Sequence, residues 1–299
     1  MTDRTSKIGT IADAVALIPD GTRLAIGGFA IYQHPMAVVR ELIRAGRKDL
    51  TVVGTVNGNE VDLLAGAGCL AKVETSYVGL EKFGLAPNFR RAIERGTLEV
   101  VDYSEILSFD RFRASQENLS FWPCDYLGGT DVLTHNKDIK PFTCPLTGRA
   151  MHAVPPADPD VVVIHAVAAD RHGNVILPQR HLLPQSLDVI MARGCDTVIV
   201  TAETIVSDAE IRRHAAQVQI PSYKTTLVVE APWGAHPCSV LGRYRADDAH
   251  FAEYIAASAS ADGFQRYIDR YVHGPADHMA YLALVGIKQL TSLTEIDRL

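Results

Sequence analysis

The sequence predicts an α/β protein with a mainly parallel sheet flanked by helices. Short β-branched runs alternate with helical patterns through most of the chain. Such alternation is typical of βαβ units, in which a helix connects each strand to the next parallel strand. With 299 residues and 47% hydrophobic content, the chain is also large enough to bury a full core.

Seven β-branched runs are expected to form the strands, at 23–28, 50–55, 72–79, 98–104, 160–166, 196–202 and 225–230. Two of the helices between them are marked by their ends. Pro35 precedes the periodic stretch 36–46, and Pro87 opens a second helix at 88–96. Gly46 and Gly96 lie where these two helices are expected to end.

The pattern changes in two places. Between about Trp122 and Pro159 it breaks into Gly, Pro, Thr and Asp, which predicts a long irregular excursion that is functional or binds a partner. From about residue 247 to residue 299 the sequence is helical, and we expect an outer layer of a single domain spanning 1–299.

Composition narrows the function classes. A net charge of -6 without a long Lys/Arg run argues against nucleic acid or membrane partners. The chain lacks both a signal-peptide stretch and a run of about 18 apolar residues, so we expect a cytoplasmic protein. The cysteines contain no C-x-x-C pair, which favours reduced thiols over a zinc site or a disulfide framework; they are Cys69, Cys124, Cys144, Cys195 and Cys238.

Candidate site residues follow the strands, because ligands of open α/β sheets bind outside the carboxyl ends of the strands. We expect these residues to surround one crevice: Gly27, Gly28, Phe29, Asn57, Gly58, Gly79, Ser104 and Glu105.

The pair Gly27-Gly28 permits a turn whose two N–H groups approach a ligand closely, as an oxyanion site for a thioester carbonyl requires. The alternative is a plain tight turn, since glycine is the default turn residue. Neither a G-x-G-x-x-G fingerprint nor a Walker A sequence is present, so nucleotide binding lacks its usual support.

Glu105 is the candidate catalytic carboxylate. It follows an apolar strand and has Tyr103, Ile106, Leu107 and Phe109 around it, a setting that would raise its pKa. Such a carboxylate serves as nucleophile toward a thioester or as general base toward water. The alternative is a glutamate at a helix N-terminus, favoured there by the macrodipole.

The histidines show no metal-binding spacing, and most are expected to be structural; those in apolar or glycine-rich contexts are His34, His165, His172, His181 and His236.

Four ordered stretches resemble the α subunits of class I coenzyme A transferases. They are Gly27-Gly28-Phe29 with Pro35, then 127–131 with 144–148, then the Ala-Asp-x-x-Gly-Asn turn at 169–174, and finally 234–237. The resemblance implies the CoA-transferase (sugar-isomerase-like) fold. It also implies a β subunit of the same fold in an α2β2 heterotetramer, and coenzyme A as part of the substrate rather than a bound cofactor.

In the transferases of this family a glutamate followed by Asn-Gly, usually on the β subunit, attacks the acyl-CoA. This chain has no Glu-Asn-Gly, and Asn59-Glu60 and Ser104-Glu105 are the nearest equivalents. The stretches 101–105 and 177–180 look more like a branch of the family that hydrolyses a CoA-linked ring intermediate in bacterial steroid (cholesterol) catabolism.

The interpretation preferred from sequence is therefore a ring-opening hydrolase subunit with Glu105 as base. In it, the backbone of Gly27 and Gly28 stabilises an oxyanion, and Phe29, Asn57, Gly79 and Ser104 contact the substrate. One alternative is a CoA transferase for glutaconate or a 3-oxoacid, with the nucleophile on the β subunit. Another is a non-catalytic scaffold subunit.

Overall fold

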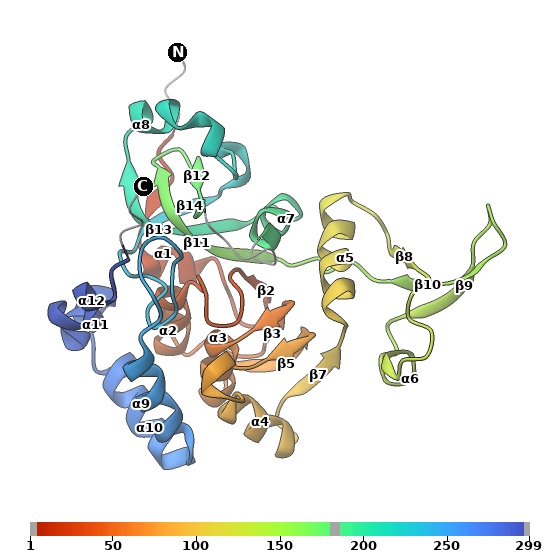
Figure 1. Ribbon diagram of the computed structural model, residues 1–299, viewed down its shortest axis with the longest axis horizontal. Helices are drawn as coiled ribbons and strands as arrows, with labels where there is room; N and C mark the ends of the chain where they lie inside the picture. Colours follow the sequence, from red (N-terminus) through yellow and green to blue (C-terminus); the bar gives the residue numbers. More distant parts are fainter. Residues whose placement is uncertain (1–4, 180–185, 296–299) are drawn as a thin grey trace.

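A nine-stranded sheet forms the centre of the described part of the chain, residues 5–179 and 186–295, in the computed structural model (Figure 1). Every strand pair in it is parallel except the pairing of β12 (Val175–Ile176) with β11. In spatial order the other strands are β1 (Ile8–Gly9), β14 (Leu227–Glu230), β13 (Val198–Val206), β11 (Val161–Asp170), β2 (Arg23–Ile26), β3 (Leu50–Val53), β5 (Leu70–Thr75) and β7 (Glu99–Asp102). The predicted α/β fold with a mainly parallel sheet is confirmed.

The strand order reverses between β2 and β11. From β2 the chain builds outward through β3, β5 and β7, and from β11 it builds the other way through β13 and β14. Such a reversal creates a crevice at the carboxyl ends of the two central strands, because the following connections leave in opposite directions. The crevice at β2 and β11 is therefore the place where this fold would bind a ligand.

Helices cover both faces of the sheet and bury two apolar cores. One face packs against α1 (Ile11–Ala16), α2 (Met36–Arg44), α3 (Asn59–Gly66) and the C-terminal helices. The other face packs against α5 (Glu105–Gln116) and α7 (Leu187–Arg193). The remaining short helices are α4 (Pro87–Glu94), α8 (Asp208–Arg213), η1 (Glu81–Phe83), η3 (Ala215–Gln217) and η4 (Ser222–Lys224).

The helix ends obey the expected rules. Pro35 is the N-cap of α2, and Gly46 beyond its end has φ +68°. Pro87 is the first residue of α4, and Gly96 beyond that helix has φ +67°. Proline fits the first turn because its missing N–H has no partner there, and glycine adopts the left-handed conformation after a helix without a Cβ clash.

The segment expected to be irregular contains regular structure. It forms an antiparallel sheet of β8 (Trp122–Cys124), β10 (Ala150–Val154) and β9 (Lys140–Thr143), with the single turn α6 (Val132–His135). Figure 1 shows this arm extending away from the body of the molecule beyond α5. Pro123 and Pro141 hid the strands from a pattern-based prediction, but both lie in edge strands, where proline breaks no central ladder.

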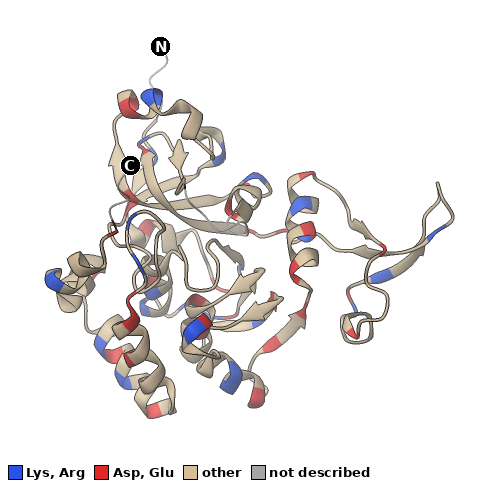
Figure 2. Cartoon of the chain, viewed as in Figure 1, with Lys and Arg blue, Asp and Glu red and all other residues tan. Residues whose placement is uncertain are grey.

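Beyond residue 247 the chain forms α9 (Asp248–Ser258), α10 (Ala261–Ile268), the π-helical turn η5 (Asp269–His273), α11 (His278–Val285) and α12 (Ile287–Leu293). Aromatic residues of these helices, including Phe251, Tyr254 and Tyr281, join the core under α2 and α3. Figure 2 shows acidic and basic residues interspersed along α9 and α10. Among the described residues, helices that are both long and apolar enough to cross a bilayer are absent.

Candidate functional site

The turn Gly27-Gly28 lies directly after β2, at the point where the strand order reverses. Gly28 has φ +100°, and a Cβ there would lie 2.6 Å from the Tyr32 carbonyl oxygen and 2.7 Å from His34 Nδ1. Glycine is the residue that tolerates both this conformation and this approach. The sequence therefore placed the turn correctly at the carboxyl end of the first long strand.

The two N–H groups of this turn already have acceptors. Gly27 N donates to the Val163 carbonyl at 2.8 Å, and Gly28 N donates to Asp188 Oδ1 at 2.9 Å. Phe29 N likewise donates to the Tyr32 carbonyl at 2.9 Å. In this conformation of the chain both N–H groups are therefore engaged, and the expected oxyanion role of Gly27 and Gly28 stays a prediction.

A buried pair, His34 and Glu60, supports the turn from the α2 face. His34 Nδ1 lies 2.8 Å from the Gly27 carbonyl oxygen, and Nε2 lies 2.9 Å from the Ala30 oxygen and 3.0 Å from Glu60 Oε2. Glu60 also accepts from Asn57 Nδ2 at 2.9 Å and from the Gly58 N–H at 3.0 Å. Because all of these contacts are buried, the Glu60 carboxylate is a structural acceptor in this chain.

The next strand ends are joined to the same turn. Ala30 N donates to the Val56 carbonyl at 3.0 Å, and Gly79 N donates to the Asn57 carbonyl at 3.2 Å. The Asn57 side chain is buried and its Oδ1 accepts from Thr75 Oγ1 at 2.7 Å. The structure thus brings the predicted residues Gly27, Gly28, Phe29, Asn57 and Gly79 into one hydrogen-bonded set.

Ser104 and Glu105 lie at the end of β7, the edge strand of the sheet. Ser104 is the N-cap of α5, and its hydroxyl accepts from Leu107 N at 3.3 Å. The Glu105 side chain is exposed, and its neighbour Ile106 is 61% exposed. The expected apolar enclosure of Glu105 is therefore absent in this chain, because Tyr103 and Leu107 turn into a separate small core; its catalytic role stays a prediction.

A second carboxylate, the largely buried Glu203, was missed by sequence reasoning. His165, within β11, lies 2.8 Å from Thr201 Oγ1 and 2.7 Å from Glu203 Oε1. Glu203 also accepts from the Tyr244 hydroxyl at 2.6 Å and from Trp233 N at 2.8 Å. Burial alone would raise its pKa, but the hydrogen bonds from His165 and these other donors hold the pKa below its ordinary value. Through Trp233 and Tyr244, this cluster joins the segment after β14 to strands β11 and β13.

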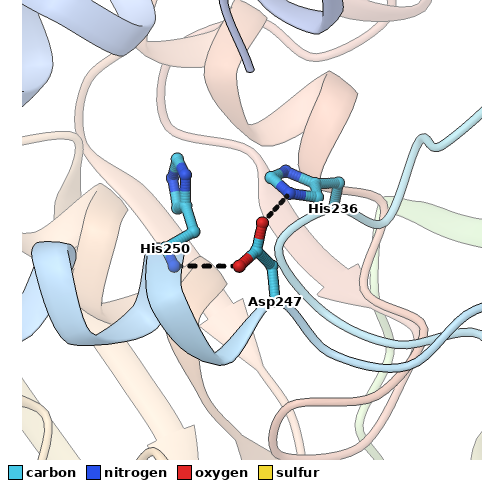
Figure 3. A group of neighbouring side chains, drawn as sticks. All are labelled: His236, Asp247 and His250. Atoms are coloured by element: carbon cyan, nitrogen blue, oxygen red, sulfur yellow. Dashed lines mark hydrogen bonds and ion pairs between the residues drawn. The ribbon is translucent and has the colours of Figure 1, made fainter. Parts of the chain in front are cut away.

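Figure 3 shows a third group, His236, Asp247 and His250, whose ligand-type atoms lie within 4.8 Å of one another. His236 Nε2 lies 3.1 Å from Asp247 Oδ2, whereas His250 meets the other carboxylate oxygen through its backbone N–H at 3.0 Å. The outer ring nitrogens of the histidines contact the Tyr281 and Tyr267 hydroxyls, each at 2.7 Å. Burial lowers the pKa of His250 to about 3, so this ring is neutral. These hydrogen bonds join the segment 236–247 to the C-terminal helices, so we interpret the group as structural.

A hollow of about 690 Å³ opens near the carboxyl ends of β11 and β13. Its wall is mainly apolar, with Arg243 and His214 as basic side chains and Glu210 as the acid. The predicted site residues do not line it. Gln179 is its last lining residue before the gap at 180–185, so Arg180 and His181, both named from the sequence, lie outside the described residues.

With this geometry in place, similarity to known proteins identifies the family. Residues 8–231 match the coenzyme A transferase family, and the chain belongs to it. The solved glutaconate coenzyme A-transferase of Acidaminococcus fermentans superposes with a TM-score of 0.92 and 29% identity, covering 98% of this chain and 96% of that one. The predicted superfamily is confirmed.

Two transferase subunits are among the similar curated relatives. The chain is 33% identical to one subunit of the 3-oxoadipate CoA-transferase of Pseudomonas knackmussii, covering 93% of this chain and 97% of that protein. It is 31% identical to one subunit of the glutaconate CoA-transferase of Acidaminococcus fermentans, covering 96% and 94%. It is also 36% identical, over 94% of its length, to an uncharacterized protein of Archaeoglobus fulgidus, of which it spans 63%.

The resemblance to the steroid branch is weaker. The chain is 26% identical to the cholesterol ring-cleaving hydrolase IpdA subunit of Rhodococcus jostii, covering 93% of this chain and 95% of that protein. Because the transferase subunits share 31–33% identity over the same span, the assignment to the hydrolase branch is not confirmed.

Proposed function

We propose that this chain is the α subunit of a CoA transferase that moves coenzyme A between small carboxylic acids such as glutaconate or a 3-oxoacid. The observation that carries the proposal is the near full-length similarity, at 31–33% identity, to the corresponding subunits of two such transferases. The chain works with a β subunit of the same fold in an α2β2 complex, and coenzyme A enters as part of the substrate.

The carboxylates of this chain support a nucleophile on the partner. Glu60 is fully buried and accepts from Asn57, Gly58 and the His34 ring, so its oxygens are not free to attack a thioester. Glu105 is exposed on the edge of the sheet, where water solvates a carboxylate and keeps it a weak nucleophile. The sequence also lacks the Glu-Asn-Gly that carries the nucleophile in the family's transferases.

The reaction then runs in two exchanges at a glutamate of the β subunit. Its carboxylate attacks the acyl-CoA carbonyl, the coenzyme A thiolate leaves, and the thiolate returns to form a glutamyl-CoA thioester while the acid departs. The acceptor acid reverses these steps and leaves as the new acyl-CoA. The strand-end turn of this chain forms one wall of the site in which the acyl group lies.

Chemical trapping tests the proposal. The complex with its β subunit is incubated with acyl-CoA and treated with borohydride or hydroxylamine, and both chains are digested for mass spectrometry. Reduction or hydroxamate formation at one glutamate of the β chain is the expected result. A modified glutamate in this chain, or turnover with no trapped glutamate in either chain, would overturn the proposal.

A second candidate is hydrolysis of a CoA-linked ring, with Glu105 as base. Two observations motivate it: the position of Glu105 at the start of α5, directly after β7, and the 26% identity to the IpdA subunit. Glu105→Gln separates the candidates. General acid–base catalysis contributes about 10²- to 10⁴-fold, so loss on that scale supports hydrolysis, whereas a transferase with its nucleophile elsewhere retains most of its turnover.

A further inference from the structure

Asp188, the second residue of α7, is a fully buried carboxylate beneath the crevice turn. Its Oδ1 accepts from Gly28 N at 2.9 Å, and its Oδ2 has no hydrogen-bond partner among the described residues. Buried polar atoms are nearly always paired, because leaving one unpaired costs the desolvation energy of that atom. A buried aspartate that accepts only one backbone hydrogen bond is therefore costly for the stability of the fold.

A comparison with Asp62, another fully buried carboxylate, shows how incomplete this environment is. Asp62 accepts from the backbone N–H groups of Asn88 and Phe89, and from the Asn88 amide and the Tyr254 hydroxyl. All of that group's oxygens are thus satisfied by structure. Asp188 has one donor, and an asparagine at the same position would supply the same acceptor without a charge.

The carboxyl group is packed directly against the turn. A Cβ on Gly27 would lie 3.0–3.2 Å from the three carboxyl atoms of Asp188. On the opposite side of the turn, His34 Nδ1 lies 2.8 Å from the Gly27 carbonyl oxygen. The turn is thus held between Asp188 on the α7 face of the sheet and the His34–Glu60 pair on the α2 face, at the point where the strand order reverses.

We propose that Asp188 is a positioning residue for the substrate: through its hydrogen bond to Gly28 it sets the conformation of the Gly27-Gly28 turn against which the acyl-CoA lies. This inference rests on the proposed function, which makes the turn a wall of the acyl-CoA site. Ionised, Asp188 makes a charge-assisted hydrogen bond to Gly28 and holds the turn in the conformation in which Gly28 has φ +100°. Protonated, it is a weaker acceptor and the Gly28 N–H is released toward the crevice.

Asp188 gains and loses its proton near neutral pH. Burial raises its pKa to about 7, with the Gly28 hydrogen bond acting in the opposite direction. Histidines also titrate near neutral pH in general, so a pH effect must be assigned by substitution. The titratable groups on the turn and on the two elements that pack against α7 are His34 on the turn, Glu105, Asp110, Arg111 and Arg113 on α5, and His165 and Asp170 on β11.

The first readout uses this chain alone and does not depend on any activity. Glycine labelled with ¹³C at the carbonyl and ¹⁵N at the amide gives carbonyl-filtered signals from Gly28 and Gly129, because only these two glycines follow another glycine. The Gly28 amide signal is expected to shift with a midpoint near neutral pH. Gly129, on the arm, is the internal control and stays constant over the same range.

The variants assign that shift. In Asp188→Asn the Gly28 titration is expected to disappear, because the asparagine keeps the acceptor but binds no proton in this range. In Asp62→Asn, the matched buried carboxylate, the Gly28 titration is expected to persist. A Gly28 signal that does not titrate in the unchanged chain, or one that still titrates in Asp188→Asn, overturns the coupling between the two residues.

The second readout is the pH profile of kcat and KM in the complex with the β subunit. Misplacing a reacting group by about 1 Å costs about 100-fold in rate, so Asp188→Asn is expected to lower kcat about 10- to 100-fold with little change in KM. In Asp188→Asn the change of kcat with pH near neutrality should be absent. In Asp62→Asn that change should remain. An unchanged profile in Asp188→Asn rejects the positioning role.

The two readouts separate this inference from the proposed function. If Gly28 titrates through Asp188 but the unchanged complex transfers no coenzyme A, the proposed function fails and the coupling stands. If transfer occurs and the Gly28 signal is insensitive to Asp188, the inference fails and the proposed function stands.

Discussion

His34 Nε2 lies 3.0 Å from Glu60 Oε2, and both side chains are fully buried. The pair joins the turn after β2 to the start of α3, since Glu60 also accepts from the Gly58 N–H. Two strand ends of the crevice are therefore held in one arrangement by a carboxylate that water cannot reach. This arrangement and Asp188 on the other face together hold the turn that we propose as a wall of the acyl-CoA site.

The first prediction concerns the stability given by Glu60. Glu60→Gln removes the charge and leaves at least one buried donor unpaired, so the free energy of unfolding should fall by about 2–4 kcal/mol. Urea denaturation of the chain measures this. The matched control is Glu94→Gln, which breaks an exposed i,i+4 pair with Arg90 and should leave the free energy of unfolding almost unchanged. Equal losses in the two variants would contradict the structural role of Glu60.

The second prediction concerns Glu74, which lies between two arginines. It accepts from Arg23 at 2.6 and 2.8 Å and from Arg111 at 2.6 Å. Burial acts to raise its pKa, but the Arg23 and Arg111 guanidinium groups together hold the pKa at about 2. A depressed pKa means that this stability is present above the unfolded value and lost as the pH falls toward the folded one.

The chain should therefore lose about 2–3 kcal/mol of stability through Glu74 between about pH 5 and pH 2. Glu74→Gln should be destabilised near neutral pH, where it leaves the buried Arg111 and the partly buried Arg23 without their carboxylate partner, and should converge toward the unchanged chain as the pH falls. Urea unfolding at several pH values measures both curves. A constant gap between them down to about pH 2 would show that ionisation of Glu74 contributes nothing.

A third prediction follows from the conformation of Gly28. Gly28→Ala places a Cβ against the Tyr32 carbonyl and the His34 ring in a left-handed conformation, so the turn must move. We expect at least a 100-fold loss of transferase turnover in the complex, since a displacement of about 1 Å has an effect of this size. Gly96→Ala is the matched control: it also has positive φ, +67°, but open space around it. Similar kinetics in the two variants would remove the turn from the site.

The fourth prediction concerns the buried group His236, Asp247 and His250. Asp247→Asn weakens the acceptor for both His236 and the His250 backbone, and should lower the free energy of unfolding by about 1–3 kcal/mol. Because both ring nitrogens of His236 and Nε2 of His250 already have hydrogen-bond partners, adding zinc or a chelator should leave the unfolding midpoint unchanged. A rise in the midpoint with zinc would instead identify the group as a metal site.

The sheet and its central turn were predictable from the sequence because their determinants are local. β-branched runs mark the strands, and Gly27-Gly28 follows one of them directly. The arm was mispredicted because Pro123 and Pro141 read as loop residues, although both occupy edge strands. Edge position is a property of the paired sheet and has no signature in a single strand.

The contacts that define the site were less predictable, because they join distant parts of the chain. Asp188 and Gly28 are 160 positions apart, and nothing in the sequence around α7 marks that aspartate. The same partner explains why the Gly28 N–H is not free. Glu105 was expected in an apolar setting because of its neighbours in sequence, but a helix start directs Leu107 inward and leaves Glu105 and Ile106 outside.

Measuring whether the total amount of thioester stays constant during turnover tests the proposed transfer of coenzyme A most directly. The complex is given an acyl-CoA and an isotopically labelled acceptor acid, and free thiol and labelled acyl-CoA are measured together. A transferase forms labelled acyl-CoA in step with the loss of the donor, with total thioester constant and no thiol released. Release of one thiol for each acyl-CoA consumed, without labelled acyl-CoA, would contradict transfer and identify a hydrolase.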